Sequence, residues 1–188
     1  HFTHTARRNV DLTYIVMDNQ IYGLTTGQTS PTSRVDMKTK STPFGSVEYP
    51  FNPIPSAIMN GATFVARGFS SDTKHLTDLM KQAIAHKGFS FISVFSPCVT
   101  FNHDNDVPFF RKRIRKLEDD NHDTTDWKTA IEKAMMWEDT IYTGLFFHNK
   151  EKTDLGHLEP VLSDDVPICQ KPTALTEEQG KNILKQMM

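Results

Sequence analysis

The sequence contains little cysteine and no excess of charge of either sign. Only two of its 188 residues are cysteine, Cys98 and Cys169, which excludes a small fold organised by disulfide bonds. Its 21 Lys and Arg residues nearly balance 23 Asp and Glu residues, and the formal net charge is -2. Because nucleic-acid-binding surfaces carry an excess of positive charge, no nucleic acid partner is expected.

The sequence also contains no apolar run of about 18 residues, the length that a membrane-spanning helix needs. We therefore expect no membrane partner, and the low cysteine content favours a reducing, cytoplasmic location. The chain begins at His1, inside a helical pattern, with neither a Met nor a signal peptide. We therefore expect that an N-terminal part is missing.

Short apolar segments alternate with segments of helical periodicity, which predicts an α/β fold with a mostly parallel sheet and helices on both faces. Strands are expected at residues 12–17, 63–66, 89–95 and 140–148. Helices are expected at residues 74–86, 110–117, 127–138 and from 176 onward. The first strand is almost entirely apolar, which is typical of a central strand buried on both faces. Residues 21–55, rich in Gly, Pro, Ser and Thr, predict a long loop.

The densest polar motif follows the first strand. Asn19 would present a side-chain oxygen at the carboxyl edge of the sheet, and the carbonyl of Ile21 could point to the same place. Oxygen ligands of this kind suit Mg²⁺, and backbone N–H groups beside Gly23 and Gly27 could bind phosphates. On the residues alone, an ordinary polar turn after a strand is the favoured interpretation.

Cys98 follows the strand at residues 89–95, at the sheet edge where open α/β proteins bind ligands. The alternative is that this thiol is a buried and inert small side chain. Cys169 lies in an irregular tail and is expected to be unpaired. His75 and His86 border a helical stripe and are expected to be solvated.

Two polar clusters have a less specific pattern. The first cluster comprises His103, Asp104, Asp106, His122 and Asp123. A metal site is disfavoured there, because these residues have no fixed ligand spacing. The second cluster is basic and is predicted to form the solvated face of a helix, or else a docking surface for an acidic protein. It comprises Arg111, Lys112, Arg113, Arg115 and Lys116.

The run at residues 18–33 resembles the signature of the β subunits of 2-oxoacid:ferredoxin oxidoreductases, which are thiamine diphosphate enzymes. Two further blocks, at residues 6–11 and 95–102, resemble the same family. The similarity extends from His1 to about Leu145 in the order that the family has. The resemblance implies an incomplete thiamine-diphosphate-binding domain over residues 1–147 and a C-terminal extension with a terminal helix over residues 148–188.

The resemblance also assigns roles to single residues. The side chain of Asn19 and the carbonyl of Ile21 would ligate Mg²⁺, and Gly23 and Leu24 would lie against thiamine diphosphate. Cys98 would be the fourth ligand of a 4Fe–4S cluster. The family's Gly-Asp-Gly-Asp segment, which completes the Mg²⁺ site, and its other cluster cysteines do not occur in this sequence. No catalytic residue is assigned here, because the family's catalytic Glu comes from the α subunit.

The implied function is that of the catalytic β subunit of a heteromeric enzyme, inactive without its α subunit. Such an enzyme decarboxylates a 2-oxoacid oxidatively, transfers the acyl group to coenzyme A and passes electrons to ferredoxin. The form Tyr22-Gly23-Leu24-Thr25 resembles members that act on 2-oxoglutarate or on a broad range of 2-oxoacids. Two alternatives stay open, a thiamine diphosphate decarboxylase without redox chemistry and a non-catalytic α/β binding or assembly subunit.

Overall fold

The computed structural model describes residues 1–160, 162, 164, 166–171 and 174–187. The chain divides into two compact units, His1–Leu155 and Gly156–Met188. The first unit contains all the strands of the described residues and therefore all of the sheet.

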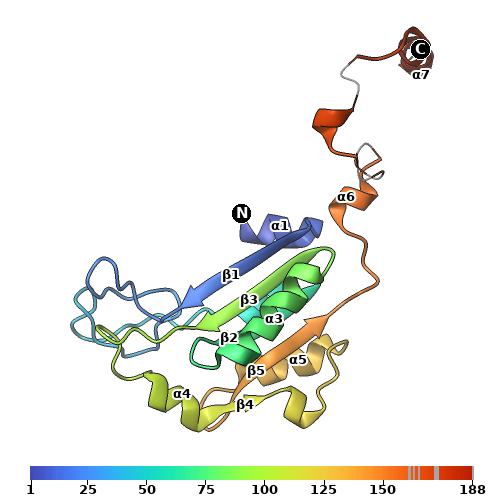
Figure 1. Ribbon diagram of the computed structural model, residues 1–188. Coiled ribbons are helices and arrows are strands. Elements are labelled where there is room, and N and C mark those ends of the chain that lie inside the picture. Colours follow the sequence, from blue (N-terminus) through green and yellow to red (C-terminus); the bar gives the residue numbers. More distant parts are fainter. Residues whose placement is uncertain (161, 163, 165, 172–173, 188) are drawn as a thin grey trace. The chain divides into compact units, whose positions relative to one another are not determined.

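The first unit is built on a five-stranded sheet with the order β1-β3-β2-β5-β4 (Figure 1). Its strands are β1 (Leu12–Asp18), β2 (Phe64–Phe69), β3 (Phe89–Phe95), β4 (Ile114–Lys116) and β5 (Ile141–His148). Strands β1, β3 and β2 run parallel, β5 is antiparallel to β2, and β4 is parallel to β5. The predicted α/β class with a mostly parallel sheet is confirmed.

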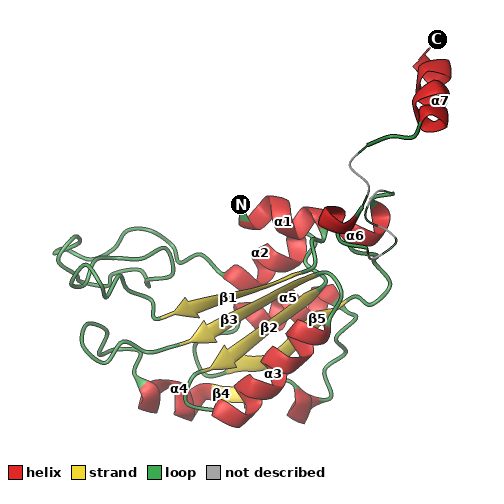
Figure 2. Ribbon diagram, turned by 45° about the horizontal axis from the view of Figure 1, so that its top comes forward, coloured by secondary structure: helices red, strands yellow, loops and turns green. Residues whose placement is uncertain are grey.

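Helices cover both faces of this sheet (Figure 2). One face packs against α3 (Thr73–Ala85), and the other against α1 (Phe2–Arg8), α2 (Pro53–Met59) and α5 (Trp127–Met135). Every residue of β2 and β3 is buried, as expected for strands with helices on both sides. Helix α4 (Val107–Arg113) packs Phe110 against Phe69 and Phe95, near the carboxyl ends of β2 and β3.

The second unit contains short helical segments. They are α6, which begins at the unit boundary (Leu155–Leu158), η2 (Ile168–Gln170) and α7 (Glu177–Met187). A capping box starts α7, because Thr176 Oγ1 accepts from the backbone N–H of Gln179 and the Gln179 side chain accepts from the backbone N–H of Thr176. Within the described residues, no helix has the length and apolar character needed to span a membrane.

The predicted central position of the first strand is wrong. In the described part of the chain β1 is an edge strand that pairs with β3 alone. Tyr14 and Ile15 are each 40% exposed and Met17 is 60% exposed. The apolar run correctly indicates a strand, but the number of neighbouring strands depends on long-range pairing that composition does not encode.

The predicted helix at residues 110–117 is also only half right. Asp106 accepts from the backbone N–H of Phe109 and starts α4 early, and α4 ends at Arg113. Residues 114–116 then form β4, which pairs with residues 141–143 of β5. The competing strand pairing therefore places Ile114 and the following residues in extended backbone. The loop predicted at residues 21–55 ends at α2, which begins at Pro53 after the N-cap Asn52.

Candidate functional site

The carboxyl ends of β1 and β3 carry the residues that the sequence indicated. The backbone N–H of Ser96, just after β3, donates to the carbonyl of Asp18 at 2.8 Å. The side-chain amide of Asn102 donates to the carbonyl of Asn19 at 3.1 Å. Because these hydrogen bonds join the two strand ends, the loop after β3 is held beside the loop after β1.

Asn19, Gly23 and Cys98 meet in one corner between these loops. A Cβ atom built on Gly23 would lie 3.5 Å from Cys98 Sγ, 3.7 Å from Asn19 Nδ2 and 3.9 Å from Phe101 Cδ2. These are ordinary contact distances, so packing within this chain does not itself require glycine at position 23. A larger side chain at that position would instead fill the corner, which glycine leaves open.

The oxygens in this corner suit a hard cation. The side-chain oxygen of Asn19 accepts from the backbone N–H of Ile21 at 3.1 Å, a bond that orients the amide. The carbonyl of Ile21 accepts no hydrogen bond from the described part of the chain. Two neutral oxygens are too few for an octahedral Mg²⁺ site, so the remaining ligands would be phosphate oxygens, water and other protein groups. No group of three or more metal-binding side chains occurs among the described residues.

The loop beyond this corner is shaped by a tight turn. Tyr22 and Gln28 form an isolated bridge, and Gly27 between them has a φ of +98°. A Cβ atom at Gly27 would lie 3.2 Å from the ring of Phe101. The positive φ and this close contact both favour glycine at position 27. The side chain of Leu24, at the tip of the turn, is 99% exposed and free to contact a ligand or another subunit.

Asp18, the last residue of β1, is a buried carboxylate on the other side of the strand end. Its Oδ1 accepts from Thr32 Oγ1 at 2.6 Å and from the backbone N–H of Gln20 at 3.0 Å. Burial raises the pKa of Asp18, against the opposing effects of those two hydrogen bonds and of the charge on Arg67. The carboxylate thereby ties the loop at residues 30–33 to the end of β1.

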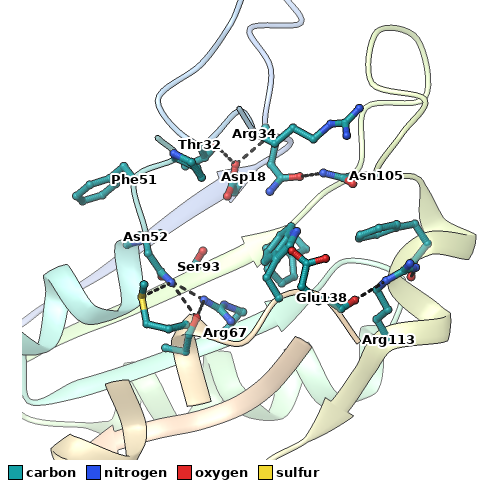
Figure 3. A pocket seen from close by; sticks show the side chains of 18 of the residues that line it. Asp18, Thr32, Arg34, Phe51, Asn52, Arg67, Ser93, Asn105, Arg113 and Glu138 are labelled. Carbon is teal, nitrogen blue, oxygen red and sulfur yellow. Dashed lines mark hydrogen bonds between the residues drawn. The ribbon is translucent and has the colours of Figure 1, made fainter. Parts of the chain in front are cut away.

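A cavity of about 520 Å³ opens beside Asp18, and we call it the Arg67 cavity (Figure 3). Arg67, in the middle of β2, is only 2% exposed, and burial lowers its pKa to about 10. The sequence analysis did not identify this residue. The available signal was a single charged side chain inside an otherwise apolar strand, residues 64–69. The cavity's lining includes Asp18, Arg34, Phe51, Asn52, Ser93, Phe95, Phe109, Arg113, Met135, Trp137 and Glu138.

The polar residues for which the sequence disfavoured a metal site do not meet at one place in the structure. Asp104 pairs with Arg34, Asp106 caps α4, Asp123 accepts from Thr125, and His122 contacts the carbonyl of Phe146. Each of these four side chains thus interacts with a different part of the chain.

The basic cluster does not form one solvated helix face. Only Arg111, Lys112 and Arg113 lie on α4, whereas Arg115 and Lys116 lie on β4. Arg115 pairs with Asp120, and Lys116 pairs with Asp72 at 2.7 Å. The prediction is wrong because β4 pairs with β5 and interrupts the helix.

The predicted solvation of His75 and His86 is wrong as well. The side chain of His75 is 13% exposed and lies 3.5 Å from Glu118. His86 is only partly exposed, because its ring lies between Thr63 and His148. Cys169 is a free and exposed cysteine of the second unit, and Cys98 is a half-buried free cysteine.

Two family models match the chain. Residues 1–94 match the thiamine pyrophosphate enzyme C-terminal TPP binding domain, and residues 98–164 match the C-terminal region of the pyruvate ferredoxin oxidoreductase β subunit. The first match covers half of the chain.

Named relatives agree with these models. A 2-oxoacid:ferredoxin oxidoreductase subunit β from Saccharolobus solfataricus is 44% identical over 80% of this chain and 52% of its own length. A protein of the same name from Sulfolobus sp is 43% identical over 96% of this chain and 63% of its own length. The chain therefore spans between half and two thirds of the length of these relatives.

A solved structure is similar as well. It is a 2-oxoglutarate:ferredoxin oxidoreductase from Magnetococcus marinus with 2-oxoglutarate, coenzyme A and succinyl-CoA bound. The TM-score is 0.84 at 36% identity, over 97% of this chain and 61% of the other.

Proposed function

Because the chain belongs to the thiamine pyrophosphate enzyme family, among the β subunits of 2-oxoacid:ferredoxin oxidoreductases, we propose that it provides the diphosphate-binding part of such an enzyme. The reaction would be the oxidative decarboxylation of a 2-oxoacid to an acyl-CoA. The observation that carries the proposal is the meeting of Asn19, Gly23 and Cys98 in one corner at the carboxyl edge of the sheet.

In this proposal the corner holds Mg²⁺ and thiamine diphosphate. Asn19 Oδ1 and the carbonyl of Ile21 ligate the cation, and the space beside Gly23 and Leu24 receives the cofactor. When bound, thiamine diphosphate would supply the carbanion chemistry that decarboxylation of a 2-oxoacid needs. The part of this chain is to fix the cation through a pre-oriented amide and an acceptor that has no other hydrogen bond within the described residues.

Cys98 is proposed as one thiolate ligand of a 4Fe–4S cluster. Its Sγ lies in the same corner as Asn19, so a cluster there would be close enough to the cofactor for electron transfer. A single thiolate cannot hold a cluster, and Cys169 is an exposed cysteine of the second unit. The other ligands would come from cysteines that this sequence does not contain.

The proposed partners are an α subunit, ferredoxin and coenzyme A, in the cytoplasm. We propose 2-oxoglutarate as the favoured 2-oxoacid, since the Tyr22–Thr25 form resembles 2-oxoglutarate members and the similar Magnetococcus marinus enzyme binds that acid. The relatives named as KorB subunits of 2-oxoglutarate enzymes support the same choice.

The Mg²⁺ role is tested by replacing Asn19 with Ala in the assembled α/β complex. Loss of one of about six oxygen ligands should weaken Mg²⁺-dependent binding of thiamine diphosphate at least about tenfold, measured by titration calorimetry. Asn60→Ala is a matched control, because in the described part of the chain that amide bonds only to Ser56 at the end of α2. Unchanged cofactor affinity in Asn19→Ala would contradict the assignment.

The cluster role is tested by Cys98→Ala beside Cys169→Ala, in the same complex prepared without oxygen. Only the first change should remove the brown cluster absorbance and ferredoxin reduction, while thiamine diphosphate still binds. Full iron content in Cys98→Ala would instead favour a thiamine diphosphate decarboxylase without redox chemistry. Absence of both iron and thiamine diphosphate from the unaltered complex would favour a binding or assembly subunit.

A further inference from the structure

Arg67 carries a positive charge that no carboxylate of the described residues neutralises by direct contact. Its Nη1 donates to the carbonyl of Tyr142 at 3.3 Å, and its Nη2 donates to Asn52 Oδ1 and to the carbonyl of Ala134, each at 3.2 Å. All three acceptors are neutral. No salt bridge within 4.0 Å reaches Arg67 from the described part of the chain. The rings of Phe95 and Phe146 lie 5.2 Å and 5.1 Å from the guanidinium, and the charge of Asp18 acts on it from a distance. Burial of a cation that no anion contacts is still costly.

Two buried polar atoms of residues that line the Arg67 cavity have no hydrogen-bond partner within the described residues. They are Arg67 Nε and Ser93 Oγ. The two residues are paired in register across β2 and β3, so their side chains project from the same face of the sheet (Figure 3). Because native proteins satisfy nearly all buried polar groups, two neighbouring unsatisfied donors indicate that a ligand supplies acceptor oxygens here.

The remaining walls are aromatic and apolar. Rings of Phe51, Phe95, Phe109 and Trp137 line the cavity, together with Met135. A volume of about 520 Å³ lies within the range of small-molecule sites, which are typically apolar clefts with a few fixed polar groups. An apolar or aromatic organic group therefore suits the space beyond Arg67.

The charges around the cavity favour a singly charged ligand. Arg67 is the one buried cation of the lining, because Arg34 is half-exposed and pairs with Asp104, and the Arg113 guanidinium contacts two carbonyls and the Phe109 ring. Asp18 and Glu138 line the same cavity, and their carboxylates would repel a second negative charge on the ligand. A monocarboxylate fits this balance better than a doubly charged phosphate.

We propose that the Arg67 cavity binds a small organic carboxylate, with its carboxylate facing Arg67 and Ser93 and its apolar body among the aromatic rings. The site is separate from the Asn19 corner and does not rest on thiamine chemistry. Its failure and the failure of the proposed function are therefore distinguishable.

The test uses 3-phenylpropionate as the probe and its neutral amide as the charge-free control, on the 188-residue chain without thiamine diphosphate. The chain has two tryptophans, and Trp137 lines the cavity whereas Trp127 lies at the start of α5. A Trp127→Phe background makes Trp137 fluorescence the only indole signal. We expect saturable quenching by the carboxylate and at least about tenfold weaker binding of the amide.

Three variants in that background complete the test, with circular dichroism as the check of folding. Arg67→Gln should weaken 3-phenylpropionate binding at least about tenfold and Ser93→Ala about threefold, in line with one charged and one neutral hydrogen bond. Arg111→Gln is the control, because Arg111 does not line the cavity, and should leave binding unchanged.

Equal binding of carboxylate and amide, or tighter binding of inorganic phosphate than of 3-phenylpropionate, would overturn the proposal. So would unchanged affinity in a folded Ser93→Ala chain. The Ser93 variant keeps the test decisive even if Arg67→Gln does not fold.

Discussion

Two groups of buried polar side chains, one at each end of the parallel strands, differ in whether they have hydrogen-bond partners. At the amino end, His148 Nε2 lies 3.2 Å from His86 Nδ1, and His86 Nε2 lies 2.7 Å from Thr63 Oγ1. Thr63 donates in turn to Asn9 Oδ1 at 2.7 Å. At the carboxyl end, by contrast, Arg67 Nε and Ser93 Oγ have no partner among the described residues.

Asn9 shows why the amino end is a structural region. Its Oδ1 also accepts from the backbone N–H of Phe89, and its Nδ2 donates to the carbonyls of Lys152 and Thr153. It ends α1 with a φ of 51°, a left-handed conformation that asparagine tolerates better than most residues. The network satisfies its polar groups within the chain and stabilises the fold, whereas Arg67 Nε and Ser93 Oγ at the other end are buried without a partner among the described residues. The difference between the two regions therefore rests on Arg67 and Ser93, because other buried polar residues at the carboxyl end, such as Asp18 and Asn102, do have hydrogen-bond partners.

The largest expected effect on stability is from Asn9→Ala, which breaks the hydrogen-bond network at the amino end. Thr63 Oγ1 and the backbone N–H of Phe89 lose a buried partner, and two carbonyls lose a partly buried one, so we expect a loss of about 3 kcal/mol in the free energy of unfolding. Urea denaturation followed by circular dichroism measures it. Asn60→Ala, at a partly buried helix end, should cost about 1 kcal/mol or less. Equal losses in the two variants would remove the distinction between the network and an ordinary polar contact.

An intermediate effect is expected from pH, again at the amino end. Burial, helped by the charges of His86 and Lys150, lowers the pKa of His148 from 6.5 to about 4, and burial also lowers the pKa of His86. Above pH 6.5 both states hold neutral imidazoles. As the pH falls from about 6.5 towards 4, the unfolded chain takes up protons that the folded chain resists, so stability decreases.

The size of that decrease is about 1–2 kcal/mol, after allowance for the partial exposure of the rings to solvent. Urea midpoints at pH 7 and pH 4.5 give the difference. His148→Phe should reduce the pH dependence, and His103→Gln, an exposed position, should not change it. A pH dependence that survives His148→Phe in full would assign it to other groups.

The smallest expected effect is at the carboxyl end and has the opposite sign. Ser93→Ala removes a buried hydroxyl that has no partner, so the free energy of unfolding should stay unchanged or rise by up to about 1 kcal/mol. Thermal unfolding of the chain without ligand measures it. A clear loss of stability would show that the hydroxyl is satisfied in solution and that the two ends of the sheet are alike.

Local patterns in the sequence predicted most elements correctly. The apolar run at residues 89–95 is β3, and the helical spacing at residues 74–86 and 127–138 corresponds to α3 and α5. The Asn19 motif and Cys98 were also recognisable, because a strand end followed by turn residues is a local signal. Their roles as cofactor and metal ligands stay predictions.

The same patterns could not place β1 at the edge of the described sheet, place Ile114 in a strand, or reveal the burial of His86. Each of these outcomes depends on a partner that is distant in the sequence. His86 meets His148 across 62 residues, and Ile114 is extended because Ile141 pairs with it.

The amino-acid sequence by itself determined the α/β alternation, the loop after β1 and the family resemblance, because periodicity and motif spacing are properties of neighbouring residues. Only the tertiary structure decided which buried polar groups found partners. Asn9 and Arg67 are both polar residues close to apolar segments, and nothing local distinguishes them. Long-range packing surrounds Asn9 with matched donors and acceptors, whereas it buries Arg67 Nε without a partner among the described residues, in a side chain that lines a cavity.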